Sequence, residues 1–401
     1  MITEQHVPQF RFKGFSDSWE QRKLGEVASF NPKEDLPDTF EYVDLESVVG
    51  TSLISHRAES RESAPSRAQR LARMGDLFFQ TVRPYQRNNY LFELPNDNYV
   101  FSTGYAQLRP SINGYFLLSR MQENTFVQKV LDRCTGTSYP AINSKDLSKI
   151  SVEVPVDSDE SEKIGEIFRS IDSLITLHQR KLDLLKELKK GLLQKLFPAN
   201  GQDRPEIRFK GFADAWEKRK LGELANIRRG ASPRPIKNKK WFSQTSQVGW
   251  IRISDVTEQN GRIHQVEQHL SDAGQKKTLV LKSKHLLLSI AATVGKPVQN
   301  YIQVGVHDGF IVFMDPKFDL DFMFYFLEKY RPNWARFGQP GSQININSEL
   351  VRDLVVSIPT VHEQVAVAQF IITLDNLIAA TQHKVDLLKK LKQGYLQKMF
   401  C

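Results

Sequence analysis

The sequence predicts an α+β protein with two pseudo-repeated globular α+β domains, joined by two long antiparallel helices that form a coiled-coil spacer. One observation behind this prediction is a repeated phrase, RFKGFSDSWEQRKLGE at 11–26 and RFKGFADAWEKRKLGE at 208–223, with three substitutions. A second is a repeated tail, KLDLLKELKKGLLQKLF at 181–197 and KVDLLKKLKQGYLQKMF at 384–400. Between these phrases the halves diverge almost completely, so the chain is a tandem duplication in which one frame carries two unlike inserts.

Each insert gives way to a helical pattern, after Pro155 in the first copy and after Pro359 in the second. A chain of 401 residues also exceeds what one core usually holds, since domains commonly span about 100 to 200 residues. The expected parts are a first globular domain at 1–157, a first spacer helix at 158–198, a second globular domain at 199–360 and a second spacer helix at 361–401.

Within the globular domains, short apolar or alternating runs bounded by turn-forming residues predict strands. In the first domain these runs are 42–49, 77–81, 99–108 and 150–156. In the second they are 250–256, 286–290, 299–306, 309–313 and 354–358. Helical spacing of apolar residues predicts helices at 115–131 and 320–330, and 19–28 is expected to be a short helix or turn. The similar order predicts the same α+β fold twice.

The two helical stretches show a heptad pattern with alternating spacings of four and three. The pattern is interrupted at matching positions, by His178 and Lys189 in the first copy and by Thr381 and Lys392 in the second. About 35 residues give a helix on the order of 50 Å long, whose apolar stripe needs a partner. The other copy is the expected partner, in an antiparallel pair. The alternative is that each helix packs back on its own domain.

Composition is that of an ordinary soluble globular protein, with 40% hydrophobic and 25% charged residues and a mean hydropathy of −0.41. No apolar run approaches the roughly 20 residues of a membrane span, and the first residues do not resemble a secretory signal. The two cysteines, Cys134 and Cys401, are consistent with a reducing compartment. The expected location is therefore the cytoplasm, without membrane association.

Catalytic motifs were not found in the sequence. It has neither a G-x-x-x-x-G-K-[ST] phosphate loop nor any G-x-G turn of the kind used to bind dinucleotides or S-adenosylmethionine. The histidines do not have the spacing of a helical metal site, and His307-Asp308 is read as a polar pair at a strand edge. We therefore expect no catalytic centre, no metal site and no cofactor bound by this chain.

The net charge of +9 favours a polyanionic partner, because clustered Lys and Arg bind phosphate backbones. The strongest local signal is RRGASPRPIKNKKWF at 228–242, expected to be an exposed loop because its prolines and glycine disfavour a helix. Its candidate DNA-binding residues are Arg228, Arg229, Arg234, Lys237, Lys239 and Lys240. The alternative is a solvated loop that Trp241 and Phe242 anchor in the core.

The remaining candidates are polar segments elsewhere in the two inserts. TVRPYQRNNY at 81–90 offers Arg83, Tyr85, Gln86, Arg87 and Asn88, all residue types that contact base edges or phosphates. Late in each insert, GTSYPAINS at 136–144 and GQPGSQININS at 338–348 could approach DNA. Their candidate residues are Ser138, Gln339, Ser342, Gln343 and Asn345. Turn formation alone is the alternative explanation of these two segments.

The repeated RFKGF-x-D-x-WE-x-RKLGE opening, the Pro359 to Gln364 segment and the tails GLLQKLF and GYLQKMF resemble the specificity subunit of a type I restriction-modification enzyme. The resemblance covers nearly the whole chain. The first copy departs from it at 156–161, where VDSDES lacks the Glu-Gln pair of the second copy.

The resemblance implies that the globular domains are target-recognition domains, each reading one half of a gapped double-stranded DNA site, with the helix pair setting the gap. It also implies two modification subunits that carry S-adenosylmethionine, and restriction subunits that use ATP and Mg2+. The chain itself would be the non-catalytic subunit of this DNA methyltransferase and endonuclease complex. A stand-alone DNA-binding regulator, or an adaptor that bridges two protein partners, is the alternative.

Overall fold

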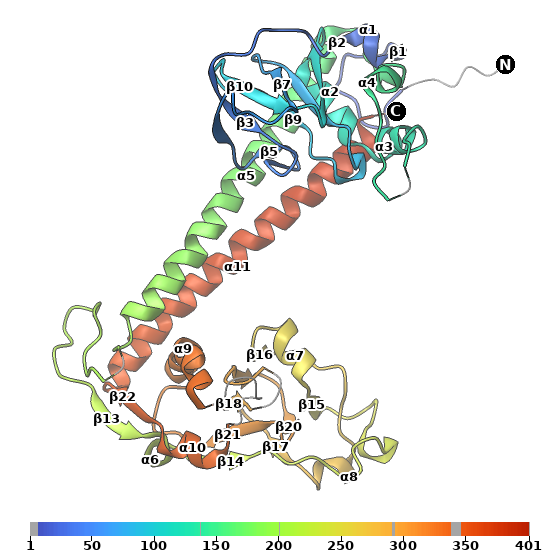
Figure 1. The fold of residues 1–401 in the computed structure, drawn as a ribbon. Helices are drawn as coiled ribbons and strands as arrows, with labels where there is room; N and C mark the ends of the chain where they lie inside the picture. The colour runs from blue at the N-terminus through green and yellow to red at the C-terminus, as the bar shows by residue number, and fades with distance from the viewer. Residues whose placement is uncertain (1–6, 137, 200, 291–292, 338–345, 401) are drawn as a thin grey trace. The chain divides into compact units, whose positions relative to one another are not determined.

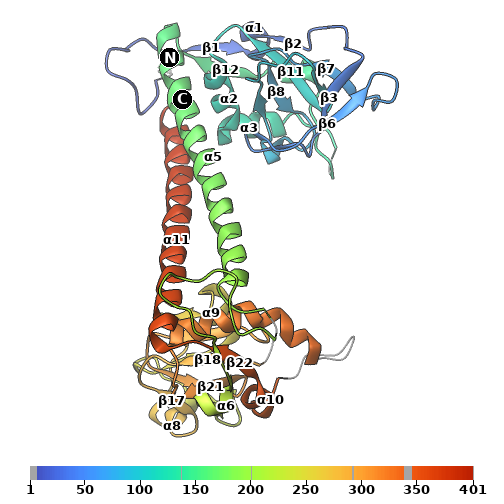
Figure 2. The ribbon, with the colours of Figure 1, turned by 90° about the vertical axis from the view of Figure 1, so that its left-hand side faces the viewer.

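The computed structural model describes residues 7–136, 138–199, 201–290, 293–337 and 346–400. The chain divides into two compact units, the first made of residues 1–181 and 381–401 and the second of residues 182–380. Two 38-residue helices, α5 (Ser158–Lys195) and α11 (Val361–Lys398), each begin in one unit and end in the other. In each unit a part of α5 and a part of α11 lie side by side (Figures 1 and 2).

The first unit contains two four-stranded sheets. One is antiparallel, in the order β2 (Ala28–Phe30), β11 (Tyr105–Pro110), β8 (Leu77–Gln80), β9 (Tyr90–Leu91). The other has the order β6 (Arg57–Ser60), β3 (Thr39–Val43), β10 (Tyr99–Ser102), β7 (Ala68–Leu71), with β3 and β10 parallel. Outside these sheets the unit contains β4 (Val48–Val49), β5 (Ser52–Leu53), α1 (Leu24–Val27), η1 (Pro84–Gln86), α2 (Gly114–Gln122), α3 (Asn124–Leu131) and α4 (Ser144–Leu147).

The second unit has a five-stranded and a three-stranded sheet. The larger has the order β14 (Asn226–Arg229), β21 (Phe310–Met314), β18 (Leu286–Ser289), β19 (Pro297–Asn300), β16 (Arg262–Ile263). The smaller has the order β15 (Gly249–Ile251), β20 (Val304–Val306), β17 (Leu279–Leu281). Its helices are α6 (Leu221–Leu224), η2 (Lys239–Trp241), α7 (Ile253–Glu258), α8 (Asp272–Gln275), α9 (Leu320–Tyr330), η3 (Arg331–Phe337) and α10 (Ser348–Asp353).

The mixture of helices and strands confirms the predicted α+β class, but several predicted elements were too long. The run at 99–108 is two strands, β10 and β11, separated by a turn at Thr103 and Gly104. The run at 42–49 leaves β3 after Val43, because Asp44 and Ser47 close a hydrogen-bonded turn. The run at 299–306 is likewise divided between β19 and β20.

Two further predicted elements are interrupted within their expected bounds. The helix at 115–131 is broken into α2 and α3 at Glu123, where the Arg87 guanidinium donates to the carbonyl of Gln122 at 2.8 Å. The strand expected at 250–256 is present only at its start, in β15, and from Ile253 the chain forms α7. The Asp255 carboxylate accepts from the backbone N–H of Arg252 at 2.8 Å and caps this helix. At 19–28 the structure has a strand, β1 (Glu20–Lys23), before the short helix α1.

The repeated opening phrase holds the start of each long helix. Arg11 forms a bidentate ion pair with the buried Glu160 of α5, at 2.6 and 2.8 Å, and the Trp19 indole donates to the same carboxylate at 3.1 Å. Arg208 and Trp216 hold the buried Glu363 of α11 in the same way, at 2.7, 2.8 and 3.3 Å. The phrase therefore recurs in both copies because a buried carboxylate needs these donors.

The departure noted at 156–161 is smaller than the sequence suggested, because Glu160 takes the place of Glu363. Ser161 then stands where the second copy has Gln364. Strand pairing repeats in the same manner. β1 pairs with β12 (Ser151–Val154), and β13 (Glu217–Lys220) pairs with β22 (Val355–Ile358), directly before each long helix.

The repeated tails pack in the unit opposite to the one in which their helix begins. Phe400, at the end of α11, contacts Trp19 and Phe168 in the first unit, with ring centroids 6.2 and 5.6 Å apart. Phe197, at the end of α5, contacts Trp216 and Phe322 in the second unit, at 6.3 and 5.2 Å. The alternative, in which each helix packs only on its own domain, is therefore not what the structure contains.

The helix pair runs antiparallel in both units, and its two partly buried lysines explain the interruption of the heptads. In the first unit Lys392 pairs with Asp172 at 2.6 Å, and in the second Lys189 pairs with Asp375 at 2.5 Å. Lys189 and Lys392 occupy matching positions in the two copies, as do Asp172 and Asp375. The two ion pairs are thus the same interaction made once in each unit, with the donor and acceptor helices exchanged.

Among the described helices, α11 is the one long and apolar enough to cross a membrane by length and composition. Charged residues interrupt this stretch, so it contains no uninterrupted apolar run of the length of a membrane span. A single such helix is weak support for a membrane span, since core helices of soluble proteins meet the same criterion. Val367, Ile371 and Val385 of this helix are in fact buried.

Replacing Arg208 with Ala should destabilise the second unit by about 3 kcal/mol, because Glu363 would remain buried without its cation. Denaturant unfolding followed by Trp fluorescence measures this change. Lys220→Ala is the control: its ion pair with Asp353 is exposed, so its removal should have little effect. Equal losses of unfolding free energy in the two variants would contradict the role of the opening phrase in holding the start of the long helix.

Phe400→Ala should destabilise the first unit by about 3 kcal/mol, although Phe400 belongs to the helix that begins in the second. Phe197→Ala should do the same to the second unit. Hydrogen exchange measured by mass spectrometry separates the two cases: faster exchange in β1 and α2 is expected for the first variant, and in β13 and α9 for the second. The reverse pattern would show that the tails are wrongly assigned.

Candidate nucleic-acid interface

The basic segment 228–242 begins in a strand, which corrects the prediction of a loop throughout. Arg228 and Arg229 lie in β14, which pairs with β21 at one edge of the five-stranded sheet. Ile227 of this strand is buried in the core, while both arginines are exposed. The edge strand therefore presents two cations to solvent, and the chain leaves it for the loop at Gly230.

Asp308 holds the first part of this loop. Its backbone carbonyl accepts from Arg229 at 2.7 Å, and its carboxylate accepts from Ser232 at 2.7 Å and from Arg234 at 2.6 Å. Burial would raise the pKa of Asp308, but the Ser232 hydrogen bond and the charges of His307, Arg234 and Arg229 outweigh burial and lower it. Arg229 and Arg234 are therefore fixed in direction by the fold, and their remaining N–H groups are available to an anion.

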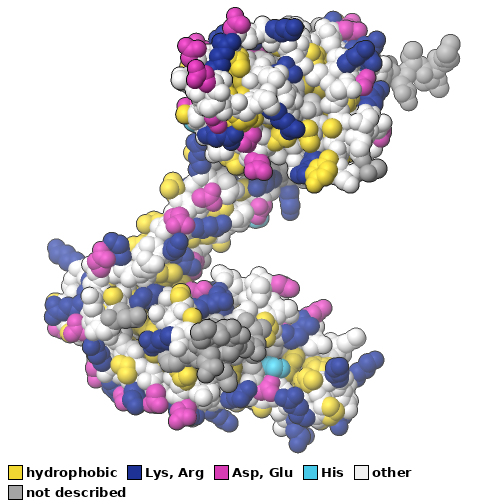
Figure 3. Space-filling view, in the orientation of Figure 1, with side chains coloured by type: hydrophobic (Ala, Val, Ile, Leu, Met, Phe, Trp, Pro, Cys, Tyr) yellow, Lys and Arg dark blue, Asp and Glu magenta, His cyan; other side chains and the backbone are white. Residues whose placement is uncertain are grey.

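The second part of the loop is anchored by Trp241, as one of the two sequence interpretations proposed. Its ring is buried and its indole N–H donates to the carbonyl of Pro235 at 3.0 Å. Lys240 lies over this ring, with its ammonium 4.3 Å from the centroid. Lys237 and Lys239 are exposed. Figure 3 shows Lys and Arg side chains over this part of the second unit, around α8. Trp241 can therefore anchor the loop in the core while the neighbouring lysines remain on the surface.

A cavity of about 550 Å³ opens beside the basic segment. Its walls combine aromatic and aliphatic side chains with cationic ones. The lining includes Ile236, Lys237, Phe242, Trp250, Arg252 and His307. Sequence reasoning had treated Phe242 only as an anchor and had not selected Trp250, although both are aromatic residues near a basic run. Aromatic faces beside cations are the surroundings that bases and sugars of nucleic acids find favourable.

In the first unit, two of the predicted segments come together. The Arg83 guanidinium lies over the Tyr139 ring, 4.4 Å from its centroid, and the Arg83 backbone N–H donates to the carbonyl of Pro140 at 2.8 Å. The neighbouring Ser138 is exposed, and Tyr85 is half-exposed. The segments 81–90 and 136–144 therefore form one surface, which distance along the sequence could not have indicated.

Other residues predicted to bind DNA in this segment are used within the fold. Arg87 donates to the carbonyl of Gln122, and the Gln86 amide oxygen accepts from Gln80 at 2.7 Å. Asn88 accepts from the backbone N–H of Gly50 at 2.9 Å, which ties the β4–β5 hairpin to this loop. These contacts engage Gln86, Arg87 and Asn88 in structural roles. Tyr85 and Gln86 are the exposed members of the set, and Arg83 is half-buried.

The predicted residues Gln339, Ser342, Gln343 and Asn345 lie outside the described residues. Within the described part of the chain, no group of three or more His, Cys, Asp or Glu side chains is placed to hold a metal ion. The chemistry of the described surfaces is therefore that of contact: cations, amides and aromatic rings that can bind phosphates and base edges.

Comparison with known proteins identifies the family. Residues 70–187 and 213–390 match the model of the type I restriction modification DNA specificity domain, and the chain belongs to this family. It is similar to the type I restriction enzyme MjaVIII specificity subunit of Methanocaldococcus jannaschii, with 23% identity over 285 residues, which are 64% of this chain and 63% of that protein. It also resembles the HindI specificity subunit of Haemophilus influenzae, with 23% identity over 192 residues, 45% of this chain and 40% of that protein.

Solved structures share the fold. The S subunit of a type I restriction-modification system from M. genitalium has a TM-score of 0.63 at 12% identity, covering 98% of this chain and 99% of that one. A chain from work on complex assembly and conformational transition of the type I R-M system has a TM-score of 0.56 at 22% identity, with the same coverage. At these identities the likeness concerns the fold alone.

Replacing Arg234 with Ala should raise the pKa of His307. Burial lowers that pKa below its usual 6.5, Asp308 opposes burial, and the charges of Arg234 and Arg229 lower it further. Removing Arg234 takes away one positive charge that repels the protonated His307 ring. It also leaves the Asp308 carboxylate free to stabilise that protonated ring, so both effects raise the pKa of His307. An NMR titration of the imidazole measures the shift. Lys240→Ala removes a positive charge from the same segment and should leave the pKa of His307 unchanged. A lower pKa of His307 in Arg234→Ala would contradict the arrangement of Arg234, Asp308 and His307.

Proposed function

We propose that this chain is the DNA sequence-specificity subunit of a type I restriction-modification complex. Each globular domain, called a reader below, binds one half of a gapped double-stranded DNA site. The first reader is residues 1–157 and the second is residues 199–360. The two long helices act as a coiled-coil spacer that sets the gap and docks two modification subunits.

One observation carries the proposal. The same frame, made of the opening phrase, the strand pair before the long helix, and the helix with its tail, occurs twice around readers with unlike surfaces. The chain that contains it belongs to the specificity family. The frame interactions recur residue for residue, from the Arg11–Glu160 and Arg208–Glu363 ion pairs to the aromatic tails. The exposed cations do not recur. Two different readers on one repeated frame suit a target of two different halves, whereas a protein that binds DNA without sequence preference has no need of the difference.

The exposed side chains divide into two kinds by what they can recognise. Lys237 and Lys239 carry point charges that suit phosphates and therefore position the duplex without reading it. Arg228 and Arg234 carry planar guanidinium groups that can also read guanine edges. In the first reader, Arg83 stacked on Tyr139 offers the same planar chemistry. Base contacts are accordingly expected from these arginines, and phosphate contacts from the lysines.

Each helix also presents apolar side chains to solvent, which support a docking role. In the first unit these are Leu174 and Leu177 of α5 and Leu387 and Leu391 of α11; in the second they are Leu184 and Leu188 of α5. Their spacing of three or four residues places them in stripes along one side of a helix. Exposed apolar stripes of this kind are suited to helices of the modification subunits.

The remaining parts of the proposal concern the complex. The chain is non-catalytic, works in the cytoplasm and binds no cofactor of its own. S-adenosylmethionine belongs to the modification subunits, and ATP with Mg2+ to the restriction subunits. This division is supported by family membership and by surfaces on this chain that offer cations, amides and aromatic rings for binding.

The test is to reconstitute the chain with its modification subunits and to sequence the bases methylated in cellular DNA. A gapped two-part site is expected. Substituting Arg228, Arg229 and Arg234 together with Ala should abolish recognition of one half-site, leave assembly intact and weaken the salt dependence of binding by about one unit for each phosphate that is no longer bound. Arg204, Lys210 and Lys218, which belong to the second reader but lie outside the basic segment, carry equal charge; replacing all three with Ala should preserve recognition. Methylation without a two-part site would reject the proposed function.

A further inference from the structure

Arg262 occupies an unusual position in the second reader. It lies in β16, the edge strand opposite β14, and its guanidinium is mostly buried over the ring of Phe324, 4.5 Å from the centroid. It is therefore shielded from the surface that carries the basic segment. The charge of Arg262 must therefore be balanced by groups inside the protein.

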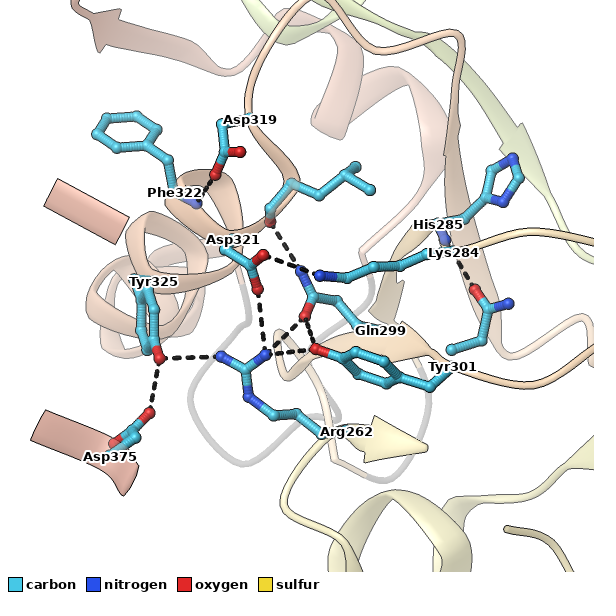
Figure 4. A network of polar contacts seen from close by, with 12 residues as sticks. Arg262, Lys284, His285, Gln299, Tyr301, Asp319, Asp321, Phe322, Tyr325 and Asp375 are labelled. Atoms are coloured by element: carbon cyan, nitrogen blue, oxygen red, sulfur yellow. Dashed lines mark hydrogen bonds and ion pairs between the residues drawn. The ribbon is translucent and has the colours of Figure 1, made fainter. Parts of the chain in front are cut away.

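Four side chains surround this guanidinium and accept its hydrogen bonds, as Figure 4 shows. They are Gln299 at 2.8 Å, Tyr301 at 2.7 Å, Asp321 at 3.1 Å and Tyr325 at 2.9 Å. Burial opposes the charge, but these neighbours outweigh burial and raise the pKa of Arg262. Gln299 belongs to the sheet, whereas Asp321 and Tyr325 belong to α9. Arg262 thus joins the sheet of the reader to its main helix.

The chain of contacts continues from the reader into the helix pair. Tyr325 is fully buried, and its hydroxyl donates to Asp375 of α11 at 2.7 Å. Asp375 in turn pairs with Lys189 of α5. A continuous polar connection therefore runs from the sheet through Arg262 and Tyr325 to both long helices, entirely within the second unit.

The matching position in the first unit is connected more loosely. Asp172, the counterpart of Asp375, receives contacts from the first reader through Tyr115 at 3.4 Å and Thr51 at 3.5 Å, both near the limit of a hydrogen bond. Beside it lies a cavity of about 680 Å³, lined by the β4–β5 hairpin and by residues of both helices. At these matching aspartates the contacts of the two readers are therefore of unequal length, although the first reader also reaches α5 through the exposed ion pair of Glu93 with Arg169 at 2.9 Å.

We propose that Arg262 is a positioning residue that, through Tyr325 and Asp375, holds the second reader in one orientation on the helix pair and so makes recognition sensitive to gap length. The proposal rests on the proposed function. Each base pair added to or removed from the gap moves the second half-site by about 3.4 Å and turns it by about 35° around the duplex. A reader that is held firmly cannot follow this displacement, whereas a loosened reader can.

The test uses the full complex with its modification subunits and synthetic duplexes whose gaps are correct, one base pair longer or one base pair shorter. Tyr325→Phe keeps the ring and removes only the hydroxyl that links Arg262 to Asp375. The ratio of methylation rates on correct and altered gaps should fall by about fivefold, since a single buried hydrogen bond to Asp375 is removed. Base preference within each half-site should be unchanged. Arg262→Gln should lower the same ratio.

Lys284→Ala is the matched control, because Lys284 pairs with Asp321 at 2.8 Å at the side of the network and outside the path to the helices. It should lower thermal stability without changing the gap ratio. An unchanged ratio in both Tyr325→Phe and Arg262→Gln would overturn the positioning role, and so would an equal change in Lys284→Ala. A wild-type complex with no preference for any gap would instead reject the proposed function itself.

Discussion

The architecture depends on a buried carboxylate at the start of each long helix. Glu160 and Glu363 are removed from water, and an unpaired carboxylate there would be strongly destabilising. The donors that compensate come from far back in the sequence, 149 residues away for Arg11 and 155 for Arg208. Each globular domain is therefore closed on itself before its helix leaves, whatever lies between the two partners.

This closure explains how the readers can differ so widely. The strand pairs β1–β12 and β13–β22, the Arg–Glu–Trp contacts and the aromatic tails bring the first and last residues of each insert together. The only requirement on the insert is that its first and last residues lie close enough to form these contacts. In the first unit the chain after β3 forms a hairpin, and in the second the chain after β15 forms α7 and β16. The second arrangement supplies Arg262 and the first does not.

The ion pairs of the helices add a reciprocal constraint. In the described part of each unit an Asp–Lys ion pair joins the two long helices, and the carboxylate comes from the helix that begins there while the lysine comes from the helix that ends there. The aromatic tails obey the same rule. Because both ends of the pair use the same interactions, a single helix sequence with small variations serves in both copies. Differences between the halves are thereby confined to the readers and to how firmly each is attached.

The sequence by itself determined the duplication, the α+β class and the long helices, because these depend on repetition and on local periodicity that survive in any context. It also located the cationic segment, since charge composition is a local property. Only the tertiary structure decided that Glu160 replaces Glu363, that each tail packs in the opposite unit, and that Arg83 meets Tyr139 while Arg87 and Asn88 serve the fold. These outcomes depend on which distant groups compete for a donor or an apolar contact. That competition is settled by packing in three dimensions, and no pattern along the chain records it.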